Sequence, residues 1–181
     1  LRKAEFELLQ SQINPHFLYN TLDAIVWLAE AGEQKKVVSM VGSLSDFFRI
    51  SLNQGQDILD VKEELQHVRS YLEIQQMRYQ DILQYELCVP EELNHCQIPK
   101  ITLQPLVENA LYHGIKNKRG KGMIRVDGAW DGEDCILRIT DNGRGMTPER
   151  LEQVLEGIRN RNVRETDIYG LYNVNERIRL N

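Results

Sequence analysis

The feature that most constrains this chain is a strand-like run that ends in an acidic, glycine-rich turn. Residues 136–140 alternate in polarity, as expected of a buried strand, and Asp141-Asn142-Gly143-Arg144-Gly145-Met146 follows directly. Glycine adopts backbone conformations that other residues avoid, and it lets a ligand approach the main chain. A carboxylate fixed beside such a turn can accept a hydrogen bond from an amino group. Asp-Asn-Gly alone is most often only a tight turn, so the remainder of the chain has to decide between the two interpretations.

Length and composition place the chain among ordinary globular proteins. It has 181 residues, of which 41% are hydrophobic, and this predicts one domain or one domain with a helical appendage. The net charge of −5 argues against a nucleic-acid surface as the main function. The longest apolar run, residues 24–29, is too short to span a bilayer. Since Leu1 is not a start methionine, we expect an excised cytoplasmic fragment, and the lack of a membrane span in it does not exclude a membrane protein.

The first 80 residues have the apolar spacing of helices. We predict helices over 1–31, with an interruption at Pro15, over 33–53 and over 61–80. The short link between the first two predicts an antiparallel hairpin. We interpret Lys62-Glu63-Glu64 as a solvated first turn, and His67 and His95 as surface residues. The inward face of the second helix is predicted to carry Val37, Val41, Leu44, Phe48 and Leu52.

After residue 80 the pattern changes to mixed strands and helices. Strands are predicted over 83–89, 123–130 and 135–140, and helices over 102–116, over 147–157 and from Gly170 to the chain end. The residues between the last two helices are charged and without periodicity, so we expect a mobile segment there. The predicted fold class is therefore α+β, with a helical region at 1–80 and an α+β unit at 81–181.

Polar residues gather on the helix predicted at 102–116. Asn109, His113 and Lys116 are four and three residues apart and share one helical face, with Glu108 one step round. Amide and carboxylate oxygens suit Mg²⁺, which commonly binds nucleotide phosphates, although an exposed polar face explains this helix equally well. A helix opening at Gly170 would direct free N–H groups at an anion. No P-loop motif, zinc-ligand spacing or Gly-x-Ser-x-Gly motif occurs in the chain.

Taken in order, these stretches resemble the N, G1 and G2 boxes of the GHKL-type ATP-binding domains, which gyrase, the heat-shock 90 chaperones and histidine kinases share. The boxes correspond to Glu108-Asn109-Ala110, Asp141-Asn142-Gly143-Arg144-Gly145 and Gly170-Leu171-Tyr172-Asn173-Val174. The stretch from Gln12 to Leu22 is similar to the phosphoacceptor box of the LytS-like branch of sensor histidine kinases. Residues 103–114 are similar to the N-box region of the same branch. The resemblance implies a dimerising, phosphoacceptor hairpin followed by a GHKL (Bergerat) α/β sandwich, which we expect to be incomplete at its C-terminal end.

The resemblance also implies roles for single residues. His16 would be the phosphorylated histidine, Asn109 would hold Mg²⁺ bridging the ATP phosphates, and Asp141 would bond the adenine amine. Gly143 and Gly145 would shape the pocket floor beside the base.

Further roles follow from the same resemblance. Gly170 and Leu171 would hinge the lid near the phosphates, and His113 would lie near the nucleotide. Other kinases carry a lysine where Tyr112 stands, so Lys116 or the basic loop 118–121 would replace it. Glu108 is a weaker candidate for polarising the reaction, and the general base is unassigned.

Two functions are consistent with these residues. The favoured one is a two-component sensor histidine kinase that uses ATP and Mg²⁺ to phosphorylate itself on His16. It would dimerise through residues 1–53 as a four-helix bundle, pass the phosphate to an aspartate of a response regulator, and lie at the cytoplasmic face of the membrane. The alternative is a GHKL-type ATP-gated conformational or dimerisation switch in which His16 is structural. Only the first function predicts phosphohistidine.

Overall fold

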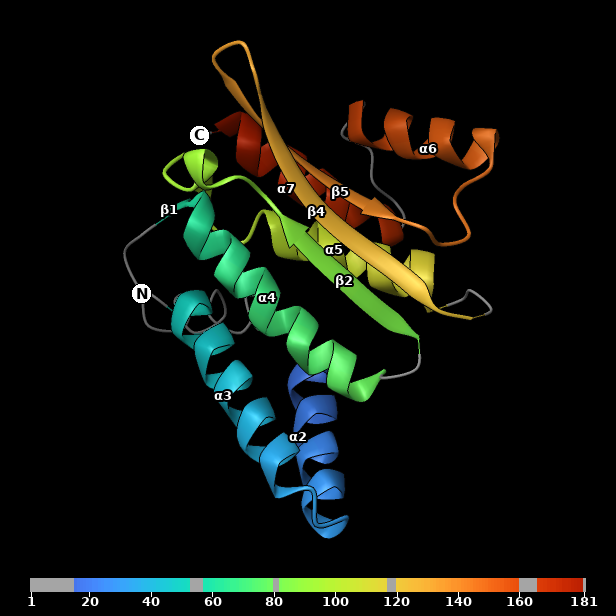
Figure 1. Cartoon of the computed structure of the whole chain (residues 1–181). Coiled ribbons are helices and arrows are strands. Elements are labelled where there is room, and N and C mark those ends of the chain that lie inside the picture. The colour runs from blue at the N-terminus through green and yellow to red at the C-terminus, as the bar shows by residue number, and fades with distance from the viewer. Residues whose placement is uncertain (1–14, 53–56, 80–81, 117–119, 160–165, 181) are drawn as a thin grey trace, which may run out of the picture.

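The computed structural model describes residues 15–52, 57–79, 82–116, 120–159 and 166–180, with side chains of the last segment described from Gly170. Its first two elements are the helices α2 (Pro15–Glu30) and α3 (Gln34–Ser51), which form a hairpin that extends away from the sheet (Figure 1). The link between them is short, as predicted, and Gly32 takes a left-handed conformation there with φ 74°. The helix predicted before Pro15 lies outside the described residues.

The buried face of α3 is displaced from the predicted face by one position along the chain. The predicted face included Val41 and Leu52, which are 47% and 41% exposed. Two sets of apolar side chains satisfy the helical spacing equally well: one at 37, 41, 44 and 48, the other at 40, 44 and 47. Only contact with the neighbouring helices decides which set is buried. The buried residues are Met40, Ser43, Leu44, Phe47 and Ser51.

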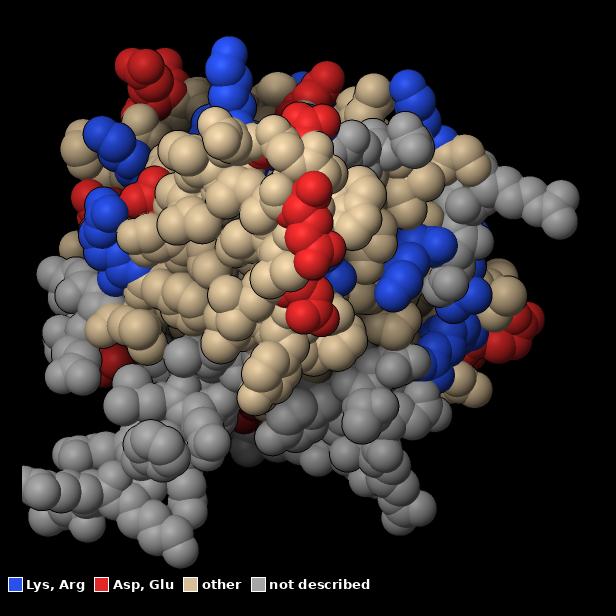
Figure 2. All heavy atoms as spheres, turned by 90° about the horizontal axis from the view of Figure 1, so that it is seen from below, with Lys and Arg blue, Asp and Glu red and all other residues tan. Residues whose placement is uncertain are grey.

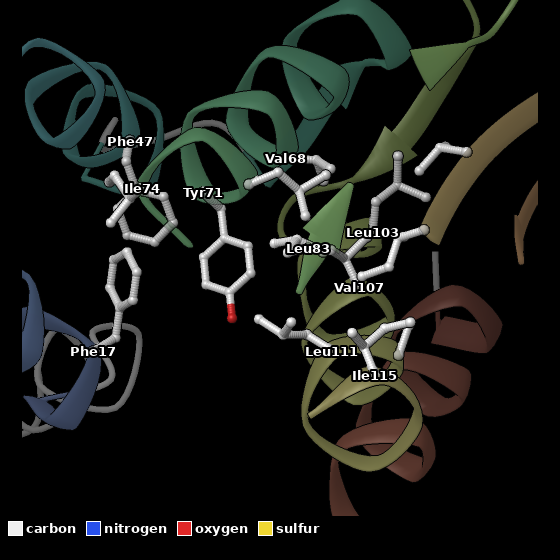
Figure 3. Packing of buried hydrophobic residues seen from close by; sticks show 14 of the residues in the cluster. Phe17, Phe47, Val68, Tyr71, Ile74, Leu83, Leu103, Val107, Leu111 and Ile115 are labelled. Atoms are coloured by element: carbon white, nitrogen blue, oxygen red, sulfur yellow. The ribbon is translucent and has the colours of Figure 1, made fainter. Parts of the chain in front are cut away.

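The third helix, α4 (Val61–Arg78), lies against α3 and supplies the centre of the hydrophobic core. The ring of Tyr71 lies 5.1 Å from that of Phe17 on α2, which in turn lies 5.0 Å from that of Phe47 on α3 (Figure 3). Two predictions for this helix are wrong. Glu64 and His67 are fully buried, because α4 is covered on several sides and not only along one stripe.

The same core continues past residue 80 into the sheet and the helix beneath it. Leu83, Leu103, Val107 and Ile124 belong to one cluster with Phe17 and Tyr71. The hydrophobic core is thus continuous across residue 80. The division of the chain into two domains at this residue stays a prediction.

Three strands form the main sheet in the order β2 (Leu83–Cys88), β4 (Gly122–Asp131), β5 (Asp134–Asp141). β2 and β4 are parallel, and β4 and β5 form an antiparallel hairpin. This confirms the strands predicted from alternation. A small second sheet pairs β1 (Ile58–Asp60) with β3 (Gln97–Pro99), and a short 3-10 turn, η1 (Glu91–Leu93), precedes β3.

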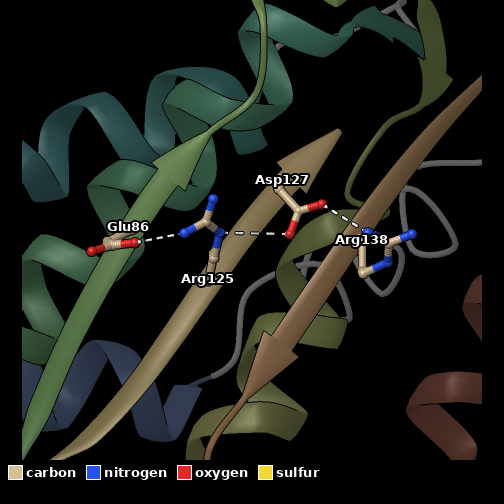
Figure 4. Close-up of polar contacts among 4 residues, drawn as sticks. All are labelled: Glu86, Arg125, Asp127 and Arg138. Atoms are coloured by element: carbon tan, nitrogen blue, oxygen red, sulfur yellow. Dashed lines mark hydrogen bonds and ion pairs between the residues drawn. The ribbon is translucent and has the colours of Figure 1, made fainter. Parts of the chain in front are cut away.

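The outer face of the main sheet carries a row of ion pairs that crosses all three strands (Figure 4). Arg125 Nη1 lies 3.2 Å from Glu86 Oε2 on β2, and Arg125 Nε lies 3.7 Å from Asp127 Oδ2 on its own strand. Arg138 Nη1 on β5 lies 3.2 Å from Asp127 Oδ1. Glu86 stands directly opposite Arg125, and Asp127 directly opposite Arg138, so the charges favour the observed register.

The remaining helices are α5 (Leu103–Asn109), the π-helical turn η2 (Ala110–Ile115), α6 (Pro148–Arg159) and α7 (Thr166–Leu180). The predicted start of the last helix at Gly170 is wrong, because α7 already begins at Thr166. Part of the segment predicted to be mobile is thus helical, and 160–165 lies outside the described residues. Within the described segments, the helices are all too short or too polar to cross a membrane.

Candidate nucleotide site

The acidic turn after β5 is closed by a hydrogen bond of its own and is joined to the start of β4 through Asn142 and Met123. Asp141 Oδ1 accepts the Gly143 N–H at 2.8 Å, and Asn142 Oδ1 accepts the Met123 N–H at 2.8 Å. Gly145 takes a left-handed conformation with φ 68°, which side chains disfavour. Asp141 Oδ2 makes no hydrogen bond to the residues that the structure describes. The carboxylate is therefore fixed in direction and keeps one oxygen available for a ligand.

Two glycines bring this turn against the backbone of η2. A Cβ on Gly143 would lie 2.4 Å from the Gly114 Cα, and a Cβ on Gly114 would lie 2.4 Å from Asp141 Oδ1. The Arg144 N–H donates to the Gly114 carbonyl at 3.3 Å. Since real Cβ atoms do not approach other atoms so closely, both positions require glycine if the turn is to lie where it does.

A pocket of about 550 Å³ opens beside this contact. Its walls come from α5 and η2, from the loop that follows β5, from α6 and from α7. The volume lies within the usual range of small-molecule sites. Its lining residues are Asn109, Ala110, His113, Gly114, Asp141, Arg144, Gly145, Met146, Thr147, Arg150, Val154 and Leu171.

The pocket includes five of the predicted site residues, namely Asn109, His113, Asp141, Gly145 and Leu171. They come from an α-helix, a π-helical turn, a strand end, its following loop and a second helix. Segments far apart in the sequence therefore meet around one cavity.

Lys116 is not among the lining residues, and its predicted role at the nucleotide stays a prediction. Its ammonium lies 5.2 Å from the ring centre of Tyr112 and 5.9 Å from that of Tyr79. The cause is the π-helical turn, in which the Lys116 N–H donates to the Leu111 carbonyl five residues back. The wider turn rotates the later side chains away from positions that α-helical spacing predicts.

Glu108 also lies outside the pocket lining. Its Oε1 accepts a hydrogen bond from Gln104 Nε2 at 3.2 Å, and burial raises the pKa of its carboxyl above the usual value. A raised pKa makes a carboxyl a better proton acceptor once it is ionised. The position beside α4 nevertheless leaves Glu108 without a place among the pocket-lining residues.

Gly170 lies inside α7 and not at its start. Its predicted contribution, a helix N-terminus that directs free N–H groups at an anion, is therefore wrong, because its backbone belongs to a continuing helix. Leu171, the next residue, does line the pocket.

His16 lies at the N-terminal end of α2, exposed to solvent. Its Nε2 is 3.0 Å from the side-chain nitrogen of Asn20, one turn later on the same helix. The following residue, Phe17, is 2% exposed and packs into the core. The backbone of the histidine is thus anchored, while its imidazole remains accessible and lies outside the pocket lining.

Several pocket residues were not predicted as site residues from the sequence. Gly114 is needed for the close contact with Asp141, and Arg144 and Arg150 bring two cations to the pocket wall. The only available signals were an arginine inside the glycine-rich turn and another in the first turn of α6. Neither of these signals indicates by itself that the side chain faces a pocket. The others are Ala110, Met146, Thr147 and Val154.

Among the described residues, there is no group of three or more His, Cys, Asp or Glu side chains placed to hold a metal ion. On the helix side of the pocket, the amide oxygen of Asn109 is available as a metal ligand. Mg²⁺ at nucleotide sites commonly takes only one or two protein ligands and completes its shell with phosphate oxygens and water, so this donor set fits it.

Sequence comparisons agree with the geometry of the two regions. Residues 4–83 match the family described as "Histidine kinase", and residues 99–181 match "Histidine kinase-, DNA gyrase B-, and HSP90-like ATPase". Relatives include the sensor histidine kinase YesM of Bacillus subtilis, 40% identical over 99% of this chain, and the sensor histidine kinase YpdA of Escherichia coli, 36% identical over 98%. The sensor protein LytS of Bacillus subtilis is 33% identical over 98% of this chain.

The chain spans 30% of the length of each of these three relatives. The two family matches together nevertheless cover the helices that carry His16 and the pocket that contains Asn109 and Asp141. The chain therefore belongs to the sensor histidine kinases and contains their gyrase- and HSP90-like ATPase region.

Proposed function

We propose that the pocket binds ATP with Mg²⁺ and that the chain phosphorylates His16. The observation that carries this proposal is the joint presence of Asp141, Asn109 and two arginines in one cavity, in a chain whose exposed His16 lies on a separate helix. An adenine, a metal-bound phosphate chain and a nucleophile each require one of these features. Phosphoryl transfer depends mainly on positioning and charge neutralisation, and these residues supply both.

In this proposal, the turn after β5 binds the adenine. Asp141 Oδ2 accepts the exocyclic amine, while Oδ1 stays bonded to the Gly143 N–H. Ala110, Met146 and Val154 supply apolar contacts for the base, since all three line the pocket. Gly145 lets the loop approach the base without a side chain between them.

The phosphate chain lies toward the polar lining of the pocket. Arg144 and Arg150 provide hydrogen-bond donors and positive charge for the phosphate oxygens, and His113 adds a ring nitrogen. Asn109 supplies one protein ligand to Mg²⁺, which when bound neutralises charge on the phosphates. Arg150 is held in direction by Gln153, whose Oε1 accepts from its Nη1 at 3.3 Å.

His16 acts as the nucleophile in the transfer step. Asn20 holds the ring through Nε2, and a neutral imidazole with its proton on Nδ1 keeps a lone pair on Nε2. Nε2 displaces Asn20 and forms a bond to the γ-phosphorus, the bond from that phosphorus to the bridging oxygen breaks, and ADP leaves. The Nδ1 proton is then released to water. The pocket and His16 must approach one another for this step, within one chain or between two.

We further propose a homodimer through α2 and α3. Both helices expose large apolar side chains, with Leu22 45%, Val26 57% and Val38 72% exposed. Residues 19, 22 and 26 are three and four apart and form a stripe along α2. Seen from the α2–α3 end, the centre of the described surface is mostly uncharged and is crossed by one narrow row of acidic residues, with other charged side chains toward the edges (Figure 2). Two such stripes would bury each other in a four-helix bundle.

Transfer of the phosphate to an aspartate of a response regulator, and attachment to the cytoplasmic face of a membrane through a preceding region, complete the proposal. Both are supported by the sensor histidine kinase names of the relatives.

The test is labelling with γ-³²P ATP and Mg²⁺. The expected product is acid-labile and alkali-stable, as phosphohistidine is, and His16→Ala abolishes it. His95→Ala is the matched control, because His95 is also an exposed histidine but lies far along the chain before β3. Full labelling of His16→Ala would remove His16 from its role, and tight ATP binding without any label would favour the ATP-gated switch.

A further inference from the structure

A buried carboxylate on α4 accepts hydrogen bonds from the backbone at the start of α5. Glu64 Oε2 accepts the N–H groups of Thr102 and Leu103, both at 3.0 Å, and Oε1 accepts the N–H of Ile101. The Glu64 side chain has no exposed surface. The first N–H groups of a helix have no partner within the helix, so one side chain from α4 satisfies the group of amides where α5 begins.

The residue at the centre of this contact has a strained backbone. Ile101 has φ 58°, in the left-handed region, and it is the single non-glycine residue with positive φ among the described residues. A β-branched side chain disfavours that region strongly. Such a conformation persists only where the surroundings hold it.

Ile101 is held from both sides. Its N–H donates to Glu64, and its carbonyl accepts from Arg177 Nη1 at 2.8 Å. The same Arg177 atom donates to the Lys100 carbonyl at 2.6 Å. The positive charge of Arg177 also lies close enough to act on the Glu64 carboxylate. A carboxylate from α4 and a guanidinium from α7 therefore clamp one strained residue.

The clamp links α4, which packs on α3, to α5 and α7. Both α5 and α7 contribute residues to the pocket lining. α5 and its continuation η2 carry Asn109 and His113, and α7 carries Leu171. Glu64 is in α4 and is not among the residues that line the pocket. A change at Ile101 would shift the start of α5, and with it the direction of Asn109, while loosening the end of α7.

We propose that Glu64 is a positioning residue for the nucleotide pocket: with Arg177, it holds Ile101 in the left-handed conformation and thereby sets how α5 and η2 present Asn109 and His113. The inference rests on the proposed nucleotide site for its effect on affinity, but its effect on the backbone of 101–116 is independent of any ligand.

The first test is Glu64→Gln in the 181-residue chain. Glutamine keeps the size of the side chain but replaces one acceptor oxygen by a donor that faces backbone N–H groups. We expect affinity for a non-hydrolysable ATP analogue, measured by calorimetry, to fall by about tenfold or more, because a buried donor is left unpaired. Without nucleotide, amide hydrogen exchange should accelerate over 101–116 and stay unchanged over 15–51.

The matched control is Glu63→Gln, in the same turn of α4. Glu63 is exposed, and a glutamine oxygen can still accept the Asp60 N–H that Glu63 Oε2 accepts at 3.1 Å. This variant should leave both affinity and exchange over 101–116 at wild-type values.

Rescue separates positioning from a general contribution to stability. Ile101→Gly removes the penalty for positive φ, so in the Glu64→Gln background it should restore most of the lost affinity. Ile101→Gly alone should bind the analogue nearly as the wild type does. If Glu64 only stabilised the fold, the double variant would bind the analogue more weakly than either single variant.

The proposal fails if folded Glu64→Gln keeps wild-type affinity and exchange, if its exchange rises equally over 15–51, or if Ile101→Gly does not rescue it. Should Glu64→Gln not fold, Arg177→Gln decides the question, since it removes the other half of the clamp from a half-buried position and must accelerate exchange over 101–116. If the wild type itself binds no nucleotide, the proposed function is wrong, and the exchange data alone still decide whether Glu64 positions α5.

Discussion

Around Phe17, large side chains fill the space between helices. Around Asp141, by contrast, backbone segments pack directly against each other because two of the residues there are glycines. Phe17, Phe47 and Tyr71 fill the space between α2, α3 and α4, with ring centres about 5 Å apart for the pairs that include Phe17. At the pocket, Gly114 and Gly143 let two backbone segments touch. The first region should be sensitive to removal of atoms and the second to their addition.

The difference follows from what each region has to do in the proposed function. The helices must hold an exposed histidine on a firm support, and ring packing supplies rigidity without occupying the outer surface of α2. The pocket must bring a carboxylate and two backbone segments within reach of one small ligand, and any Cβ between them would take that space. Substitutions that add or remove single groups can therefore test the comparison directly.

The largest effect should come from removing a ring. Phe17→Ala deletes a side chain that is 2% exposed, and we expect the free energy of unfolding to fall by about 3–5 kcal/mol. Denaturant unfolding at a fixed protein concentration measures it. The control is Leu180→Ala at the end of α7, where the side chain is 80% exposed and the change should be within about 0.5 kcal/mol. Equal effects of the two substitutions would contradict the ring-packed support.

Acid should weaken the same ring cluster through His67. The ring of His67 stacks on Phe47 at 4.5 Å, and burial lowers its pKa from 6.5 to about 4. Between these two values the unfolded chain binds more protons than the folded one. The stability contributed by the neutral ring is thus complete above pH 6.5 and is lost as pH falls toward 4, by about 3 kcal/mol in total.

The measurement is the free energy of unfolding as a function of pH for the wild type and for His67→Gln. Burial raises the pKa values of Glu64 and Glu108, which gives stability changes of the opposite sign over part of the same range. Both proteins share those carboxyls, so the difference between the two curves isolates His67. Parallel curves between pH 4 and 6.5 would mean that burial does not lower the pKa of His67 in the folded chain.

Adding one methyl group should damage the pocket. Gly114→Ala places a Cβ 2.4 Å from Asp141 Oδ1, so the carboxylate has to move from its position beside Gly143. We expect affinity for the ATP analogue to drop about a hundredfold, or nearly 3 kcal/mol. Calorimetry measures this drop.

The matched control is Gly42→Ala on α3, where an added Cβ meets no atom within 4 Å. Alanine should stabilise that helix by about 0.5–1 kcal/mol and leave affinity unchanged. If Gly114→Ala binds the analogue as well as the wild type, Asp141 does not lie where the structure places it.

The smallest predicted effect keeps every atom position and changes only polarity. Asp141→Asn should lower ATP affinity by about tenfold, because a charge-assisted bond to the adenine amine is lost. A guanine nucleotide, which lacks that amine, should bind weakly to both proteins. Unchanged ATP affinity in calorimetry would remove Asp141 from the adenine role while leaving the pocket itself intact.

Local patterns in the sequence predicted much of this architecture. The strands β2, β4 and β5 lie within two residues of the ranges expected from alternation, since side chains of a strand with one covered face show it directly. The turn at 141–145 was recognisable because its glycines and its aspartate are adjacent in the chain. The placement of Asn109, His113 and Leu171 around one pocket followed from the family resemblance, and the structure brings them together.

Other features depend on contacts between distant segments. Glu64 and His67 were expected at the surface because glutamate and histidine in a helical turn usually lie there, yet the start of α5 and the rings around Phe47 cover them. Lys116 points away from the pocket because a π-helical turn interrupts α5, and spacing alone does not reveal such a turn.

The sequence by itself determined the family, the three strands of the main sheet and the acidic glycine turn, because each depends on residues that are neighbours in the chain. Only the tertiary structure decided which face of α3 is buried, that Gly114 must lack a side chain, and that Glu64 meets Ile101. The physical reason is the same in all three cases. Burial, steric exclusion and the pairing of a buried charge arise between surfaces that are brought together by the packing of distant segments, and no local periodicity encodes that packing.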